Sequence, residues 1–139
     1  MIARTKIENH TISAIMIDVD NYKKINDTHG HLSGDLILKV VTDCFKTVLN
    51  SSDLLSRVGG DEFAVLLPGQ DRHQAEEVAE RLRSSLEQAA IIVRNQQVAI
   101  TASFGVAEID RDRMDLDDLL NRADQALYQS KSAGKNTVS

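Results

Sequence analysis

The chain makes a tight acidic turn at Arg57-Val58-Gly59-Gly60-Asp61-Glu62-Phe63, between two short apolar runs. The pair Leu54-Leu55 leads into the turn, and residues 63–67 lead out of it before Pro68-Gly69 stops the second run. Two strands joined by a glycine-containing turn predict a β-hairpin. Glycine supplies the positive φ expected of such a turn, and it lets a ligand approach the bare backbone.

The adjacent carboxylates of Asp61 and Glu62 repel each other unless a cation lies nearby. A hydrated hairpin tip is the alternative interpretation, because polar and charged residues are common at exposed turns. The choice between the two depends on whether another acidic residue reaches this turn in the folded chain.

Length and composition predict one soluble domain. The 139 residues are enough for a single packed core, and 42% hydrophobic with 27% charged residues is ordinary for a globular chain. A net charge of −5 argues against nucleic-acid binding, which favours a basic surface. No apolar run approaches the roughly 20 residues that span a bilayer, so we expect no direct membrane contact.

The chain has a single cysteine, Cys44, and no visible secretory signal. One cysteine cannot form an internal disulfide, and its place on an apolar helix stripe favours a buried thiol over a nucleophile. We therefore expect a cytoplasmic location, although the full protein could be anchored in a membrane.

Hydrophobic periodicity predicts the order β-α-β-β-α-β-α. Met1 to Thr11 reads as the end of a helix, and Asn21 to Leu32 as a polar loop with a short helical turn around 22–26. The main expected elements are a buried strand at 12–19, a helix from a Ser33 cap to Leu49, a hairpin at 53–67, a helix at 72–90, a half-buried strand at 98–106, a helix at 115–132 and an edge strand at Thr137-Val138. This order predicts an α+β sandwich of the ferredoxin-like kind, with helices covering a mostly antiparallel sheet.

The first strand ends in Asp18-Val19-Asp20. Antiparallel pairing with the hairpin would bring Asp18 to Asp61 and Glu62. Carboxylate oxygens without His or Cys companions suit Mg²⁺ or Mn²⁺. Because magnesium is commonly completed by substrate phosphates, the sequence predicts a nucleotide site.

Other acidic-loop interpretations fit less well. An EF-hand starting at Asp18 lacks its required residues at Tyr22, Lys23 and His29. No phosphate-binding loop of the Walker type is present, and His29 and His31 lack metal-ligand partners. A phosphatase that uses Asp18 as nucleophile remains an alternative, although such sites normally lie on a parallel βαβ sheet.

Four spaced motifs resemble the GGDEF family, the diguanylate cyclases of bacterial signalling. They are the turn at 59–63, the run from Asp18 through Gly34-Asp35, the strand Ser103 to Ala107, and the helix from Ala123 through Lys131 to Asn136. The resemblance covers the chain from about Ile12 to its end. It implies a single domain over residues 1–139, with a sandwich of the nucleotidyl-cyclase palm type.

The resemblance implies specific roles for the matching residues. Metal would be held by Asp18, the carbonyl of Val19 and Asp61, with two Mg²⁺ or Mn²⁺ ions per site, and Glu62 would complete the acidic set as a ligand or in activating the attacking hydroxyl. Phosphates would lie against the backbone of Asn21, Tyr22 and Lys23 and near Lys131 and Lys135, and guanine would be read by Asn26 and Asp35. Gly59 and Gly60 would leave room for the nucleotide.

The implied reaction joins two GTP molecules into cyclic di-GMP with release of pyrophosphate. Each domain would bind one GTP, so catalysis would need a homodimer. The full protein would also carry an upstream sensory or dimerisation domain. The rival within the family is an inactive domain that only binds GTP or docks on a partner.

The chain departs from the family pattern at several positions. Tyr22 stands for the usual Phe, Ser130 for Ala and Lys135 for Arg. The family's inhibitory product site uses Arg-x-x-Asp before the turn, but here Asn50 replaces the Arg while Asp53 is retained. The family's opening segment is largely missing, so we expect an N-terminally truncated domain.

Overall fold

The computed structural model describes residues 11–89, 91–93 and 95–139, and the expected helix end at Met1 to His10 lies outside the described residues. The elements along the chain are β1 (Ile12–Val19), α2 (Tyr22–His29), α3 (His31–Val48), β2 (Leu54–Arg57), β3 (Glu62–Pro68), α4 (Arg72–Glu87), β4 (Ile91–Val93), β5 (Gln96–Val98), β6 (Ala102–Glu108) and α5 (Leu116–Ser132).

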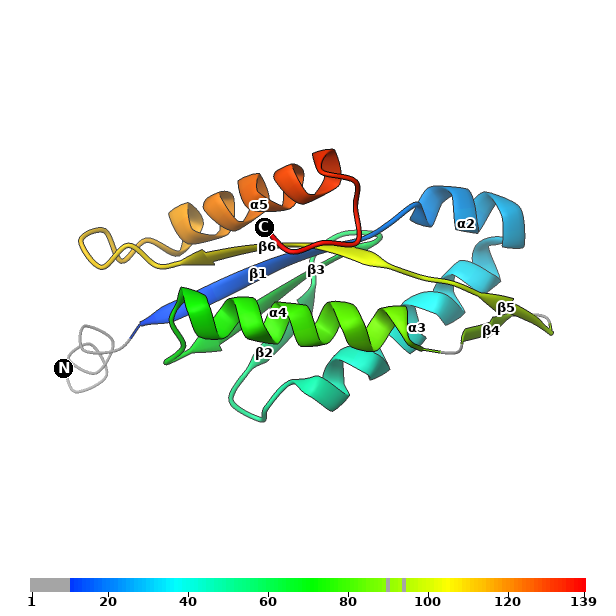
Figure 1. Ribbon diagram of the computed structural model, residues 1–139, viewed down its shortest axis with the longest axis horizontal. Helices are drawn as coiled ribbons and strands as arrows, with labels where there is room; N and C mark the ends of the chain where they lie inside the picture. Colours follow the sequence, from blue (N-terminus) through cyan, green and yellow to red (C-terminus); the bar gives the residue numbers. More distant parts are fainter. Residues whose placement is uncertain (1–10, 90, 94) are drawn as a thin grey trace.

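Four strands form an antiparallel sheet in the order β2-β3-β1-β6, and β4 pairs with β5 in a separate hairpin. Helix α5 lies on one side of the sheet, and α3 and α4 lie on the other (Figure 1). This arrangement confirms the predicted α+β sandwich of the ferredoxin-like, cyclase-palm kind.

The central strand β1 is buried on both faces, as its nearly continuous apolar run predicts. Ile15 and Ile17 belong to the larger core between the sheet and helices α3 and α4. Ala14 and Met16 belong to the smaller core under α5. Because its neighbours hold this strand on both sides and both faces, the carboxylates at its end have a fixed position.

The polar segment after β1 was expected to be a loop with a short helical turn around 22–26, but it forms a longer helix. Helix α2 occupies Tyr22–His29 and contains no fully buried residue, which explains why its composition reads as a loop. Helix α3 begins at His31 with Gly30 (φ 90°) as its N-cap, so Ser33 is a buried residue in the first turn and not the expected cap. The short polar helix forms because its half-buried face packs against α3.

The strand expected at 98–106 is two strands separated by residues 99–101. Strand β6 is buried on both faces instead of one, because α5 covers the face that carries the small residues Ser103 and Gly105. A β-carbon on Gly105 would overlap Leu127 N and Ala123 O of α5, so only glycine allows this close contact. The alternation of large and small residues reflects a helix against the strand rather than solvent.

Smaller differences concern the ends and faces of helices. Helix α4 ends at Glu87, and residue 90, its expected end, lies outside the described residues. In α3 Cys44 is only half-buried, although a buried thiol was expected, and the neighbouring apolar residue Leu36 is exposed. The expected strand at the C-terminus is a single parallel bridge from Val138 to Phe104.

Candidate functional site

The end of β1 and the turn between β2 and β3 lie side by side. In the β1–β3 pairing Asp18 stands opposite Glu62, and the Val19 N–H donates to the carbonyl of Asp61 at 3.0 Å. Antiparallel pairing thus brings together the three acids Asp18, Asp61 and Glu62, which are far apart along the chain.

The turn is closed by backbone hydrogen bonds to Glu62. Its carbonyl accepts from the N–H groups of Val58 (3.0 Å) and Gly59 (3.4 Å). The expectation of positive φ in the turn is wrong, since the glycines with positive φ are Gly30, Gly69 and Gly134. A β-carbon on Gly60 would meet no atom within 4 Å, so the outer side of the turn is open to a ligand.

Arg57 fixes the shape of this turn, a contact that the sequence analysis missed. Its Nε donates to the carbonyl of Gly59 at 3.1 Å, and its Nη2 donates to the carbonyl of Gly60 at 2.8 Å. One planar guanidinium therefore holds two successive carbonyls, which a lysine could not do. The position of Arg57 two residues before the glycines was the available signal.

The carboxyl group of Asp18 is under electrostatic strain. Burial raises its pKa from 3.8 to about 7; Lys131 opposes the rise, while Asp61 and Glu62 add to it by repulsion. Asp18 Oδ1 is buried and accepts no hydrogen bond from the described residues. A cation or a proton bound at Asp18 would relieve the repulsion from the neighbouring carboxylates.

Lys131 of α5 reaches the acids from the other side. Its Nζ lies 2.8 Å from Asp20 Oδ1, 3.5 Å from Asp18 Oδ2 and 3.4 Å from the Asp18 carbonyl. The side chain is only 23% exposed. Lys131 therefore neutralises the strand-end carboxylates, and it is not a freely solvated cation.

Asp20, which the sequence analysis did not assign to the site, is a buried anchor. Its carboxylate accepts from Ser103 Oγ (2.6 Å), Thr101 Oγ1 (2.7 Å) and the N–H of Asn136 (3.0 Å) in addition to Lys131. Burial alone would raise the pKa of Asp20, but the hydrogen bonds from Lys131, Ser103 and Thr101 outweigh it and lower the pKa. The buried acid thus ties β1 to the segment after α5.

The N-terminus of α2 follows directly after Asp20 along the chain. Asn21 is its N-cap in the left-handed conformation (φ 57°), and among the described residues no side chain caps the first N–H groups. The first amide bonded within the helix is that of Ile25, to the Asn21 carbonyl. Lys135 Nζ donates to Asn21 Oδ1 at 2.7 Å, while Lys23 is exposed. Free amides, the helix dipole and nearby lysines together favour an anion.

The remaining predicted residues, Asn26 and Asp35, lie on α2 and α3. Asn26 is half-buried and packs against the backbone at Gly34, where a β-carbon would overlap Asn26 Oδ1. Asp35 is the next residue along α3 and is exposed. The two side chains come from helices that pack against each other.

Comparison with known proteins identifies the family of this chain. The family model described as "Diguanylate cyclase, GGDEF domain" matches residues 1–137. The chain belongs to the GGDEF family. It is 39% identical over 131 residues to diguanylate cyclase A of Treponema denticola, which covers 94% of this chain and 35% of that protein. The GGDEF domain thus spans about a third of the length of this relative.

Solved structures of GGDEF domains superpose closely. The active GGEEF domain of a diguanylate cyclase from Vibrio cholerae matches with a TM-score of 0.89 and 34% identity, over 99% of this chain and 86% of that chain. The GGDEF domain of DgcB from Caulobacter crescentus in complex with c-di-GMP matches with a TM-score of 0.91 and 31% identity, over 99% of this chain and 82% of that chain.

The donor set of this GGDEF domain suits a hard cation. Within residues 11–89, 91–93 and 95–139, no three His, Cys, Asp or Glu side chains are grouped so as to hold a metal ion. A site here would therefore combine the carboxylates of Asp18 and Asp61 with backbone oxygen. The buried, unsatisfied Asp18 Oδ1 is the kind of atom that a bound cation would satisfy.

The segment that would hold the family's inhibitory site in this GGDEF domain precedes β2. Asp53 Oδ2 accepts from the Asn50 N–H at 2.9 Å, and Asp53 Oδ1 accepts from Gln70 Nε2 at 3.3 Å. A shallow cavity of about 420 Å³ lies beside them, lined by Lys46, Leu49, Asn50, Ser51, Asp53, Leu54 and Leu55. Asp53 is thus already engaged by residues of its own chain.

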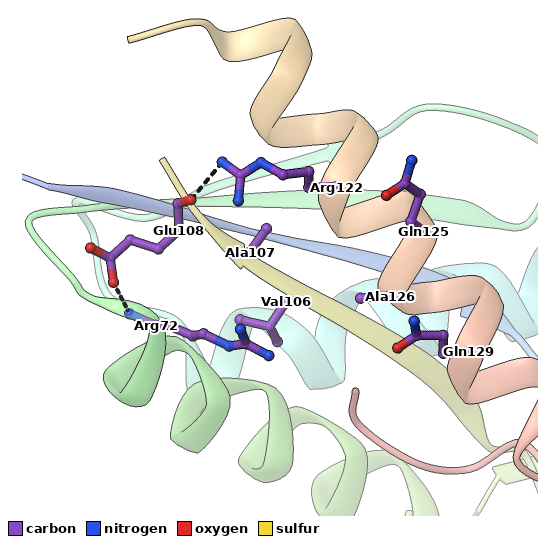
Figure 2. A pocket seen from close by; sticks show the side chains of 8 residues that line it. All are labelled: Arg72, Val106, Ala107, Glu108, Arg122, Gln125, Ala126 and Gln129. Atoms are coloured by element: carbon purple, nitrogen blue, oxygen red, sulfur yellow. Dashed lines mark hydrogen bonds between the residues drawn. The ribbon is translucent and has the colours of Figure 1, made fainter. Parts of the chain in front are cut away.

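A separate groove of about 310 Å³ lies between α4, α5 and the edge strand β6 of the GGDEF domain. Figure 2 shows Arg72 and Arg122 on either side of Glu108, with the Arg72 N–H donating to Glu108 Oε1 and Arg122 Nη2 to the Glu108 carbonyl. None of the residues that line it belongs to the acidic site.

Among the described helices, none is both long and apolar enough to cross a membrane.

Proposed function

We propose that the chain is a catalytically competent diguanylate cyclase domain, which condenses two GTP molecules into cyclic di-GMP and two pyrophosphates. The observation that carries the proposal is the complete acidic set: Asp18, Asp61 and Glu62 are all present and meet where β1 ends beside the turn. Half-buried carboxylates that repel one another and raise the pKa of Asp18 are typical of functional sites, which supports the proposal.

In this proposal Asp18, the carbonyl of Val19 and Asp61 would hold two divalent cations, Mg²⁺ or Mn²⁺. The unsatisfied Oδ1 of Asp18 and its raised pKa support a cation between the two carboxylates. Bound metal would supply charge stabilisation for the attacking and leaving oxygens of the displacement. The ammonium group of Lys131 opposes the rise in the pKa of Asp18 and so favours its ionised form, which is the form that would bind a cation.

The N-terminus of α2 would bind the phosphates of GTP. Its free amides at Asn21, Tyr22 and Lys23 point away from the helix, and their dipole favours a negative charge. Lys135 is held beside them by Asn21 and would neutralise an outer phosphate. Lys131 lies deeper, so its charge acts at the acidic cluster and at the phosphate nearest to it.

Asn26 and Asp35 would read the guanine. A carboxylate accepts from the N1–H and 2-amino groups of guanine, and an amide can both donate and accept. Asp35 is exposed and available to a ligand. Gly60 would allow the nucleotide close to the turn, because nothing occupies the space of its missing side chain.

One domain offers one such nucleotide site, so the reaction would need two copies face to face. The 3′-oxygen of one GTP attacks the α-phosphorus of the other, the bond to the leaving pyrophosphate breaks, and the 3′-hydroxyl proton is taken up by a base. Glu62 is the candidate base, or else a further ligand. Repetition in the other direction closes the ring. In the full protein an upstream sensory or dimerisation domain would bring the copies together.

The rival function is a GTP-binding domain without turnover. Incubation of the chain with GTP and Mg²⁺ at high protein concentration, with chromatography of the products, separates the two. The cyclase proposal expects cyclic di-GMP and pyrophosphate, loss of both in Asp61→Ala, and no loss in the matched variant Asp124→Ala on the exposed face of α5. Binding of GTP without product would support the rival, and phosphate release alone would indicate a phosphatase.

A further inference from the structure

Tyr22 lies along the proposed nucleotide site, between its phosphate end and its base end. It is the first residue of α2, so its backbone amide lies at the proposed phosphate position. Its hydroxyl lies over the bare backbone of α3, where a β-carbon on Gly34 would be 2.7 Å from the hydroxyl oxygen and would overlap Asn26 Oδ1. One side chain therefore connects the phosphate end of the site with the residue proposed to read the base.

The surroundings of this hydroxyl come from three elements. Burial raises the pKa of Tyr22, Asp35 of α3 and Asp61 of the turn raise it further, and Arg57 of β2 opposes them. The phenol therefore stays protonated at neutral pH and can donate a hydrogen bond. The charges that act on it lie on both the base side and the metal side of the site.

Packing of the Tyr22 ring does not explain why this side chain carries a hydroxyl group. The ring of Tyr22 is half-buried and packs with Ile25 against the larger core, and a phenylalanine ring would make the same contacts. In the part of the chain that the structure describes, no hydrogen bond engages the hydroxyl. The oxygen is thus a polar group at the site whose hydrogen-bonding capacity is available to a ligand.

We propose that the Tyr22 hydroxyl is a specificity-determining group that hydrogen-bonds the nucleoside of the substrate along its sugar edge, which comprises guanine N3, the 2-amino group and the ribose 2′-hydroxyl. The inference rests on the proposed function, because it takes the phosphates to lie at the start of α2 and the base at Asn26 and Asp35. A nucleotide placed between those ends lies along the tyrosine, and its sugar edge comes nearest to the hydroxyl.

The test is equilibrium titration of the chain and of Tyr22→Phe with GDP, inosine diphosphate and 2′-deoxy-GDP, none of which carries a pyrophosphate leaving group. Loss of one neutral hydrogen bond should weaken GDP binding about 3- to 10-fold. If the hydroxyl bonds the 2-amino group, Tyr22→Phe and the unmodified chain should bind inosine diphosphate equally well. If it bonds the 2′-hydroxyl, they should bind 2′-deoxy-GDP equally well. If it bonds N3, Tyr22→Phe should bind all three ligands more weakly. In turnover of GTP the KM should rise by the same factor, with kcat nearly unchanged.

The matched control is Tyr128→Phe, which removes a hydroxyl from a tyrosine that is 74% exposed on α5. It should change none of the dissociation constants. Equal affinity of Tyr22→Phe and the unmodified chain for GDP overturns the inference and leaves the cyclase proposal intact. Absence of GDP binding by the unmodified chain overturns both. Thermal denaturation of Tyr22→Phe should match that of the unmodified chain, because the ring contacts are kept.

Discussion

Asp18 stands directly opposite Glu62 in the pairing of β1 with β3, next to the hydrogen bond from the Val19 N–H to the Asp61 carbonyl. This register places an acid from a buried strand against an acidic turn. A slip of the pairing by one residue would turn Asp18 to the opposite face of the sheet. The position of the site is therefore set by the same pairing that builds the core.

The stability of the metal-free chain should fall as the pH rises towards neutrality. Asp18 has a pKa of about 7 when folded and an ordinary value of 3.8 when unfolded. Between these values the folded state binds more protons, so the contribution of Asp18 is complete below 3.8 and is lost as the pH passes about 7. Thermal denaturation in the presence of a chelator, from pH 5 to pH 8, measures this slope.

Asp18→Asn should remove most of this slope and should raise the melting temperature at pH 8, because a neutral amide neither titrates nor repels Asp61. The matched control Asp124→Asn, on an exposed position of α5, should keep the slope. At pH 8, added Mg²⁺ should raise the melting temperature of the unmodified chain by more than it raises that of Asp18→Asn. A slope that survives in Asp18→Asn would show that another group is responsible.

Asp20→Ala should destabilise the fold by about 3 kcal/mol or more at neutral pH, because it leaves Lys131 and several donors without their buried partner. The folded pKa of Asp20 is lowered, so its contribution is present above its usual pKa and is lost as the pH falls below it. Urea denaturation at pH 7 measures the change. Asp20→Asn should cost less, and equal losses for both variants would argue against a role for the charge.

Gly105→Ala and Gly60→Ala should differ sharply. The first places a methyl group into the backbone of α5 at Leu127 and Ala123, and it should cost about 3 kcal/mol of unfolding free energy. The second points into open space and should change stability by less than about 0.5 kcal/mol. Denaturation of both proteins checks this. Retained stability of Gly105→Ala would contradict the close contact between α5 and β6.

Arg57→Ala should lower the proposed cyclase activity about 10- to 100-fold while the fold remains stable, because the exposed guanidinium holds two carbonyls of the turn next to Asp61. Arg57→Lys keeps the charge but cannot hold both carbonyls, so it should recover little of the activity. The measurement is the rate of cyclic di-GMP formation alongside the melting temperature. Full recovery in Arg57→Lys would indicate that charge alone matters.

Cyclic di-GMP should not bind tightly near Asp53, because Asn50 offers no guanidinium and the Asp53 carboxylate is occupied by Asn50 and Gln70. Titration calorimetry with cyclic di-GMP should detect no tight binding at this position. Asn50→Arg should introduce it. A stacked pair of cyclic di-GMP molecules bound at Asp53 in the unmodified chain would contradict the prediction.

The sequence by itself determined the order of the main elements and most candidate residues. The apolar run of β1, the stripes of α4 and α5, and the turn at 59–63 are local patterns that depend on side-chain periodicity and turn chemistry. The polar helix α2 was expected only as a short turn around 22–26, because the packing of its half-buried face on α3 stabilises it, although Tyr22, Ile25 and His29 recur at helical spacing. Likewise, the alternation in β6 could not reveal that a helix covers its second face.

Only the tertiary structure decided how the site residues act on one another. Long-range pairing aligned Asp18 with the turn, and the approach of α5 to β6 carried Lys131 to Asp20. The hydrogen bonds from Arg57 to the turn carbonyls and the raised pKa of Asp18 depend on distances and burial, which no local pattern encodes. The physical reason is that electrostatic interactions and hydrogen bonds follow separation in space, whereas sequence periodicity reports only which face of an element is apolar.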